Sequence, residues 1–188
     1  MNNITQSGDT TTPKSYVEDY IEFNKNHSTT NEDNFIEFDR QWAKFTETHK
    51  VLRDNSNNIF NKLFSKNLLP FQTLDFHDSY IVSNVKPEKD NQFSIEFRLM
   101  RFDNYDNSRT SSEDGNNVKF YFDDKHRDNF RSFGNKTQTV MAVMYDGNQL
   151  GIVALTQANK YRGFVFNNIT INEVEVTPAI SRKKKLIW

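Results

Sequence analysis

The chain of 188 residues contains no cysteine. It therefore has no thiol for a disulfide, a thiolate zinc site, an iron–sulfur cluster or a cysteine nucleophile. Its 6 glycines are scattered and form neither the G-x-G-x-x-G nor the Walker A string of a phosphate-binding loop. It also has no G-x-S-x-G string and no S-x-x-K string in its catalytic context. We expect a protein that is not an enzyme and that needs no cofactor.

An excess of either charge is missing as well. Lys and Arg number 24 against 25 Asp and Glu, a net charge of -1, whereas a dedicated nucleic-acid binder normally carries a basic excess. The longest apolar runs are a few residues, far below the roughly 20 that a membrane helix needs. The first 15 residues, MNNITQSGDTTTPKS, show no basic region followed by an apolar one, as a signal peptide would. We expect a cytoplasmic protein with no membrane partner.

Apolar residues are also scarce, at 35% of the chain, with a mean hydropathy of -0.82. Average globular chains contain roughly 45–50%. Large side chains offset this shortage, because 17 Phe, 7 Tyr and 2 Trp make up 14% of the residues. Each buried Phe stabilises a fold by about 1.5–3 kcal/mol, so the composition predicts a core of few but large side chains.

The N-terminal third is predicted to be helical. Residues 1–13 are polar and are expected to form a disordered tail, and residues 14–67 a helical hairpin. Thr12 and Pro13 are typical of a helix start, with Thr as N-cap and Pro at the first helical position. An apolar face at helical spacing then predicts a first helix over 14–26. A second, long helix is expected over 32–66, with an interruption at Asn55–Asn58, where helix propensity is poor.

A heptad pattern runs along the second helix. His49 and Ser56 occupy two a positions of this pattern. The apolar a and d positions form a stripe along the helix, which we call the seam, and Phe60 and Phe64 widen it at its C-terminal end. The seam can be buried by the first helix of the same chain, which is the nearest candidate. It can also be buried by the same helix of a second chain, so the pattern is compatible with a monomer and with a homodimer. The apolar a and d positions are Phe35, Phe38, Trp42, Phe45, Leu52, Ile59 and Leu63.

Residues 68–178 show strand periodicity and are expected to form an antiparallel sheet of six or seven strands. The fold class is therefore α+β. Alternation is clear in Phe93–Leu99 and Val118–Phe122, and Tyr80–Val85 supplies a further strand. A short helical turn is expected within Asp124–Phe133. The polar stretch 102–117 is predicted to be a long exposed loop, and residues 179–188 a basic tail.

Two hairpins are expected in the later part of the sheet. Val140–Tyr145 and Leu150–Leu155 flank Asp146-Gly147-Asn148, a strong turn signal. Tyr161–Phe166 and Ile169–Val176 are expected to pair around Asn167-Asn168. The apolar phase shifts between Ile171 and Val174, which indicates a bulge or the end of a strand.

One histidine lies beside carboxylates, in the string Leu74-Asp75-Phe76-His77-Asp78-Ser79. His77 with Asp75 and Asp78 could serve metal-assisted hydrolysis. However, neighbouring residues on a strand point to opposite faces, so His77 and Asp78 cannot easily address one ligand. The other histidines show no ligand spacing. A structural or partner-binding pair is the preferred interpretation, and no metal site is predicted.

The same string carries a family resemblance. Leu69-Pro70-Phe71, then Leu74–Ser79 with Ile81 two residues on, resembles a family of uncharacterised proteins from Gram-positive bacteria, in which L-x-F-H-D-x-x-I leads into an antiparallel β domain. Gly163–Ile171 is similar to the closing strand pair of that family. The resemblance covers residues 68–101 and 161–176, and the chain departs from the family in its short N-terminal helices and its 102–117 loop. Such proteins often look like immunity proteins encoded beside toxins, which implies a binding role.

These observations predict a protein that binds and neutralises another protein, a toxin or a defence component. Tyr and Arg are enriched among the residues that dominate interfaces, so Arg101, Tyr105 and Tyr121 are the expected anchors, together with the pair His77 and Asp78. The alternative is a nucleic-acid-binding accessory protein of a mobile element or phage, which would use the aromatic sheet and the basic tail. The basic residues of that tail are Arg182, Lys183, Lys184 and Lys185.

Overall fold

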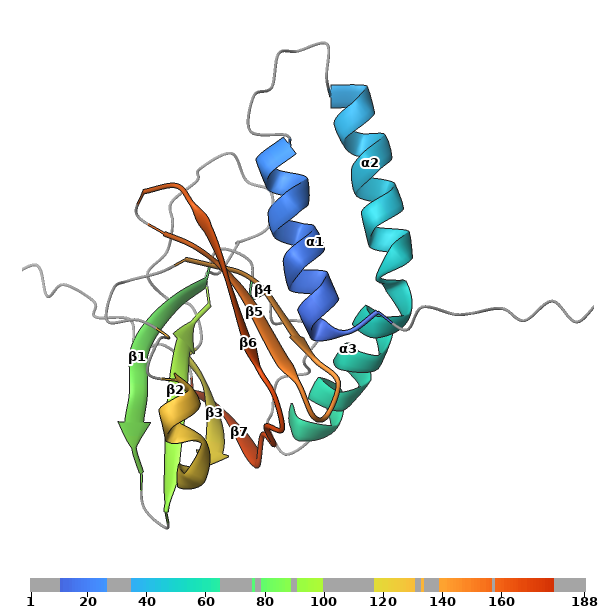
Figure 1. Cartoon of the computed structure of the whole chain (residues 1–188). Helices are drawn as coiled ribbons and strands as arrows, with labels where there is room; N and C mark the ends of the chain where they lie inside the picture. The colour runs from blue at the N-terminus through green and yellow to red at the C-terminus, as the bar shows by residue number, and fades with distance from the viewer. Residues whose placement is uncertain are drawn as a thin grey trace, which may run out of the picture.

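The computed structural model describes residues 11–26, 35–64, 76, 79–88, 91–99, 117–130, 133, 139–156 and 158–177, and the side chains at 82–86 are not described. The predicted α+β class is confirmed, because helices precede a seven-stranded antiparallel sheet (Figure 1). The helical elements are α1 (Pro13–Asn26), α2 (Phe35–Thr48), α3 (Lys50–Phe64) and the 3₁₀ helix η3 (Asp124–Phe130). The strands are β1 (Ser79–Pro87), β2 (Gln92–Arg98), β3 (Asn117–Asp123), β4 (Thr139–Tyr145), β5 (Leu150–Leu155), β6 (Tyr161–Phe166) and β7 (Glu173–Thr177).

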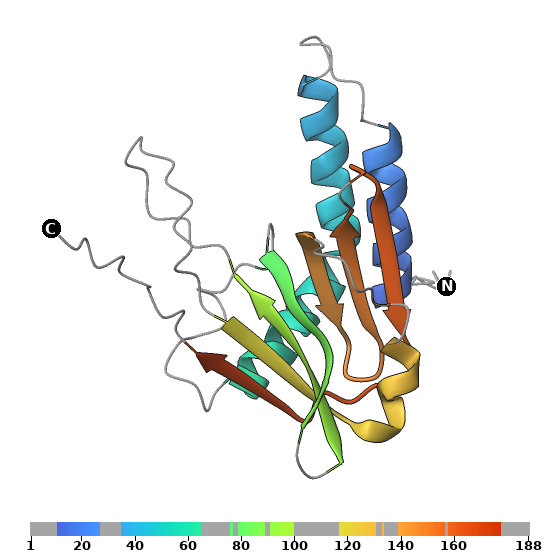
Figure 2. The ribbon, with the colours of Figure 1, turned by 90° about the vertical axis from the view of Figure 1, so that its left-hand side faces the viewer.

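The sheet is strongly bent between β1 and β4. The strand order is β6-β5-β4-β1-β2-β3-β7, and all pairs are antiparallel. Only Ser79 and Tyr80 of β1 pair with β4, whereas β2 and β3 pair over seven residues each. The two halves of the sheet therefore diverge from this short joint (Figure 2). Their inner faces point toward each other and enclose the main core.

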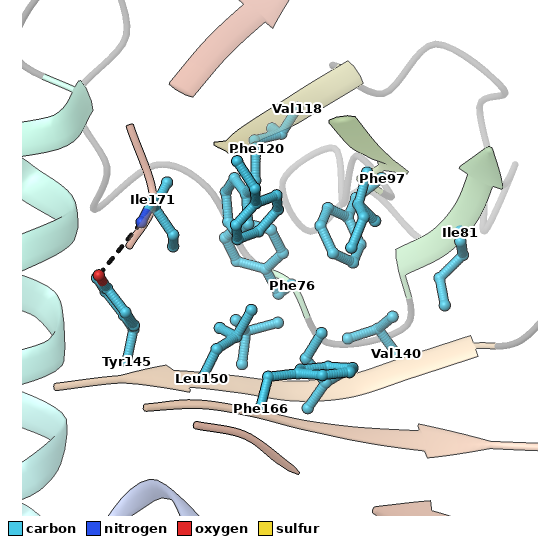
Figure 3. Close-up of a cluster of buried hydrophobic side chains, with 14 of the residues drawn as sticks. Phe76, Ile81, Phe97, Val118, Phe120, Val140, Tyr145, Leu150, Phe166 and Ile171 are labelled. Atoms are coloured by element: carbon cyan, nitrogen blue, oxygen red, sulfur yellow. Dashed lines mark hydrogen bonds between the residues drawn. The ribbon is translucent and has the colours of Figure 1, made fainter. Parts of the chain in front are cut away.

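Phenylalanine side chains fill the space between the two halves. Phe97 and Phe120 extend from one half toward Leu150 and Phe166 of the other (Figure 3). Phe130 of η3 stacks on Phe166 with 3.9 Å between ring centroids, so η3 joins the end of β3 to β6. The predicted core of few but large side chains is confirmed, because most fully buried large side chains are aromatic. They are Phe60, Phe64, Phe93, Phe97, Phe120, Phe122, Phe130 and Phe133, with Ile95, Leu150, Ile152 and Ile169.

Helix α3 covers the core where the two halves of the sheet separate. It packs against β4 and β7, and its Phe60 and Phe64 are 1% exposed. The Oγ of Ser56 accepts a hydrogen bond of 3.0 Å from the backbone N–H of Tyr145 in β4. Asn55–Asn58 thus lie within a continuous helix, and the predicted interruption there is wrong. Burial of this helix face outweighs the poor helix propensity of its asparagines.

The bend between α2 and α3 lies at His49 instead (Figure 1). In the last turns of α2 the Thr46 hydroxyl donates to the carbonyl of Ala43, and the Thr48 hydroxyl donates to that of Lys44. Such bonds from Ser and Thr back to the preceding turn bend helices. The expected single helix over 32–66 is therefore two helices.

Aromatic rings join α1 to α2, as the heptad pattern predicted. Tyr16 and Tyr20 of α1 contact Phe45, at 5.3 and 5.9 Å between ring centroids, and Phe23 contacts Trp42 at 5.3 Å. His49 is buried in this seam. Phe35 at the start of α2 is 57% exposed, so the burial expected for this position is wrong. None of the helices in the described ranges is long and apolar enough to cross a membrane.

Helix α1 lies on the outer face of β5 and β6. It begins at Pro13 as predicted, with the Thr12 hydroxyl accepting from Ser15 N and the Ser15 hydroxyl accepting from Thr12 N. Glycine lets it approach closely: a Cβ built on Gly163 would lie 2.3 Å from Val17 Cγ1, and one on Gly151 would lie 2.8 Å from the Pro13 carbonyl. The positions of these two glycines therefore fix the helix against the sheet.

The expected hairpin of 161–166 with 169–176 is wrong. β6 pairs with β5 at one edge of the sheet, and β7 pairs with β3 at the other edge. The buried Tyr145 hydroxyl holds the link between them: it accepts from Ile171 N at 3.2 Å and lies 3.1 Å from the Ile169 carbonyl (Figure 3). The phase shift between Ile171 and Val174 coincides with the start of β7 at Glu173, and residues 169–172 are not part of a strand, so the strand expected over 169–176 is shorter than predicted.

His49 makes stability depend on pH. Its Nε2 donates to Asp19 at 3.0 Å, and the rings of Tyr16 and Phe45 enclose it. Burial lowers the pKa of the imidazole below its ordinary value; Asp19 opposes this shift, Arg53 of α3 adds to it, and burial dominates. In the pH range around this pKa the unfolded chain binds more protons than the folded one. The contribution is therefore complete above the unfolded pKa of about 6.5 and is lost as the pH falls through the lower folded value.

We expect wild type to lose more unfolding free energy than His49→Gln between about pH 7.5 and pH 5.5, because glutamine does not titrate. Urea denaturation at a series of pH values measures both slopes. Equal losses in the two proteins would show that His49 is not held neutral by burial.

Candidate protein-binding surface

Of the partner-binding residues that the sequence predicted, the structure describes Tyr121. Arg101, Tyr105, His77 and Asp78 lie outside the described residues. So do Asp75 of the metal hypothesis and most of the 102–117 loop. The basic residues of the nucleic-acid alternative, Arg182, Lys183, Lys184 and Lys185, lie outside them as well.

Tyr121 lies on the outer face of the half-sheet formed by β2, β3 and β7. On β3 every second residue is buried in the core, so Lys119 and Tyr121 point to the opposite side. The register places Tyr121 between Ser94 of β2 and Glu173 of β7. The Tyr121 hydroxyl donates a hydrogen bond of 2.5 Å to Oε2 of Glu175. This hydrogen bond holds the ring in one orientation, and the Tyr121 side chain is half-buried.

Carboxylates surround Tyr121 and outnumber the cations beside them. In the register Lys119 lies between Glu96 of β2 and Glu175 of β7. Its Nζ is 3.7 Å from Oε1 of Glu88, which also accepts from the Ser94 hydroxyl at 2.9 Å, and 6.0 Å from the centre of the Tyr121 ring. The described cations of this face are Lys119 and Arg98 of β2, against four glutamates, so its described side chains carry net negative charge. We call the residues Glu88, Ser94, Glu96, Lys119, Tyr121, Glu173 and Glu175 the acidic face.

The Tyr121 hydroxyl remains a donor at all ordinary pH values. Burial raises its pKa above the ordinary value, and the hydrogen bond to Glu175 and the charges of the neighbouring carboxylates raise it further. A phenol that is protonated and bound to a carboxylate cannot act as a base. The arrangement therefore offers a fixed aromatic ring and carboxylate acceptors, which is the chemistry of recognition.

The described part of the chain contains no group of three or more His, Asp or Glu residues that could hold a metal ion. On the acidic face the nearest hydroxyls, those of Ser94 and Tyr121, both donate to glutamates.

The sequence alone did not reveal the glutamates of β7 as part of this surface. Alternation on β3 is enough to place Lys119 and Tyr121 on one face. Glu173 and Glu175 join them only because β7 pairs with β3, and the expected pairing of that segment with β6 placed them elsewhere. The alternation of Glu173, Val174, Glu175 and Val176 was the available signal, but it does not name the neighbouring strand.

Comparisons with protein-family models, curated proteins and solved structures were made for the whole chain. None of them found a match.

Proposed function

We propose that the protein binds another protein through the acidic face and thereby neutralises it, the partner being a toxin or a defence component. The observation that carries the proposal is Tyr121, whose half-buried side chain is hydrogen-bonded to Glu175 in the middle of the acidic face. Tyrosine is enriched among the residues that contribute most of the binding energy in protein interfaces.

The charge of the face indicates the chemistry of the partner. Glu88, Glu96, Glu173 and Glu175 would complement a surface rich in lysine and arginine, and such complementarity steers association and rejects partners of the wrong charge. Toxins that act on nucleic acids carry basic surfaces because they must bind phosphates. A rigid acidic face that covers such a surface would block access to the nucleic acid.

The face is preorganised, which favours tight binding. Its residues lie on hydrogen-bonded strands backed by the fully buried Phe120 and Phe122. The Tyr121 ring is already fixed by its hydrogen bond, so little side-chain entropy is lost when a partner binds. A rigid surface of this kind therefore favours a function in binding.

The test is affinity capture from cells that produce the products of the neighbouring genes. The wild type is compared with the double variant Glu173→Lys/Glu175→Lys and with a control, Glu18→Lys/Glu47→Lys, which makes the same charge change at exposed positions on α1 and α2. We expect a basic protein that the wild type and the control capture equally. The face variant should capture it about 10-fold less or worse, because like charges then oppose each other.

Two outcomes would overturn the proposal. One is that no protein is captured above the level of empty resin. The other is that the face variant, shown by circular dichroism to be folded, captures the same protein as well as the control does.

A further inference from the structure

A groove lies on the helices, lined by none of the residues of the acidic face. α1 and α2 run side by side (Figure 1), and the groove between them has a volume of about 450 Å³. This is within the range of sites that hold small molecules. Its lining residues come from both helices and from the bend at His49.

The two walls carry opposite charges. Asp19, Glu22 and Asn26 follow one another at helical spacing along α1, and Gln41, Lys44 and Thr48 do so along α2. Glu22 and Lys44 form no ion pair with each other in the described structure, although both line the groove. Each wall therefore presents charge to the space between them.

The floor of the groove is aromatic. It is formed by Phe23 and Phe45, whose ring centroids are 5.9 Å apart. Arg40 also lines the groove, but its guanidinium donates two hydrogen bonds to Glu37, at 2.7 and 2.8 Å, so its charge is largely balanced.

The inner end of the groove lies at His49. This residue lines the groove and is fully buried, and its Nε2–H donates to Asp19. Its Nδ1 has no hydrogen-bond partner in the described structure and is itself shielded from solvent. The group that presents charge to the groove at this end is therefore the half-exposed carboxylate of Asp19.

From these features we infer that the groove binds a small zwitterionic amine of the free amino acid class. Its ammonium group faces Asp19 and Glu22, and its carboxylate faces Lys44. An apolar or aromatic side chain packs on Phe23 and Phe45. A ligand with only one charge is attracted by one wall and repelled by the other, so the zwitterion is preferred.

Three probes with the same ring separate the charges: L-phenylalanine, phenethylamine, which lacks the carboxylate, and 3-phenylpropionate, which lacks the ammonium. Each is titrated into ¹⁵N-labelled full-length protein, and the backbone amides of Phe45, Thr48 and His49 are followed by NMR. We expect L-phenylalanine to bind with a Kd below about 1 mM, and each singly charged analogue to bind about 10-fold more weakly or worse.

Two variants test which wall binds which charged group of the ligand. In Lys44→Gln the preference for L-phenylalanine over phenethylamine should shrink, and in Glu22→Gln the preference over 3-phenylpropionate should shrink. The control Glu18→Gln, on the exposed side of α1, should leave both preferences unchanged. The inference is overturned if the groove amides do not shift with L-phenylalanine at about 10 mM, if the three probes bind equally, or if the variants change nothing.

Discussion

Replacing Phe120 by alanine is expected to lower the free energy of unfolding by about 3–5 kcal/mol. This ring is fully buried at the point where β3, α3 and the segment before β1 meet. Its centroid lies 5.6 Å from that of Phe60, 5.8 Å from Phe76 and 5.2 Å from Phe97. Truncation leaves a cavity that these rings can fill only in part. Domains of this size are stable by about 5–15 kcal/mol in total, so the variant should be markedly less stable.

Urea denaturation followed by circular dichroism measures this loss. Val51→Ala is the matched control, because Val51 is 78% exposed and its truncation should change stability by no more than about 0.5 kcal/mol. A loss below about 1 kcal/mol for Phe120→Ala would mean that the two halves of the sheet do not enclose this ring.

The substitution Gly163→Ala is expected to destabilise the protein by about 1–3 kcal/mol, although alanine is normally favoured over glycine within a strand. The added Cβ would lie 2.3 Å from Cγ1 of Val17 and 3.0 Å from Cδ1 of Ile21. Val17 is branched at Cβ and fully packed, so it cannot rotate away. Relief therefore requires α1 to move off the sheet.

A double-mutant cycle with Val17→Ala isolates this clash. In the Val17→Ala background the nearest methyl group, Cγ1 of Val17, is gone and Ile21 Cδ1 at 3.0 Å remains, so Gly163→Ala should then cost much less than it does in the wild type. The same loss in both backgrounds would show that α1 does not rest on Gly163.

Features that depend on neighbouring residues could be read from the sequence. The turn between β4 and β5 forms because Asp146 Oδ1 accepts from the backbone N–H of Asn148 and Gln149, and Gly147 adopts a φ of 98°. The start of α1 at Thr12 and Pro13 is equally local. Each of these features is determined by a few adjacent side chains, and each was predicted.

Features that depend on distant contacts could not be read in this way. Ser56 lies among asparagines that disfavour a helix, yet its hydroxyl meets Tyr145 on β4 and the helix continues. β6 and β7 are close in sequence, but Phe166 stacks on Phe130 at one edge while Val174 is paired with Phe120 at the other. Periodicity shows that a segment is a strand, and it does not show which strand lies beside it.

The acidic face shows the same division. Tyr121 was expected as an anchor from its residue type. The carboxylate that fixes it, Glu175, is 54 residues away along the chain and reaches it only through the β3–β7 pairing. Likewise, the His49–Asp19 contact spans 30 residues and follows from the packing of α1 on α2.

Site-specific photo-crosslinking in the producing cells tests the central proposal most directly. A benzoyl derivative of phenylalanine is placed at position 177, an exposed residue of β7 on the same face as Glu175, and in a second protein at position 18, on the exposed surface of α1. Tyr121 and the glutamates of the acidic face stay intact. If the acidic face binds the partner, light gives a covalent adduct with one basic protein from position 177 and no such adduct from position 18. No adduct from position 177, or the same adducts from both positions, would contradict the proposal.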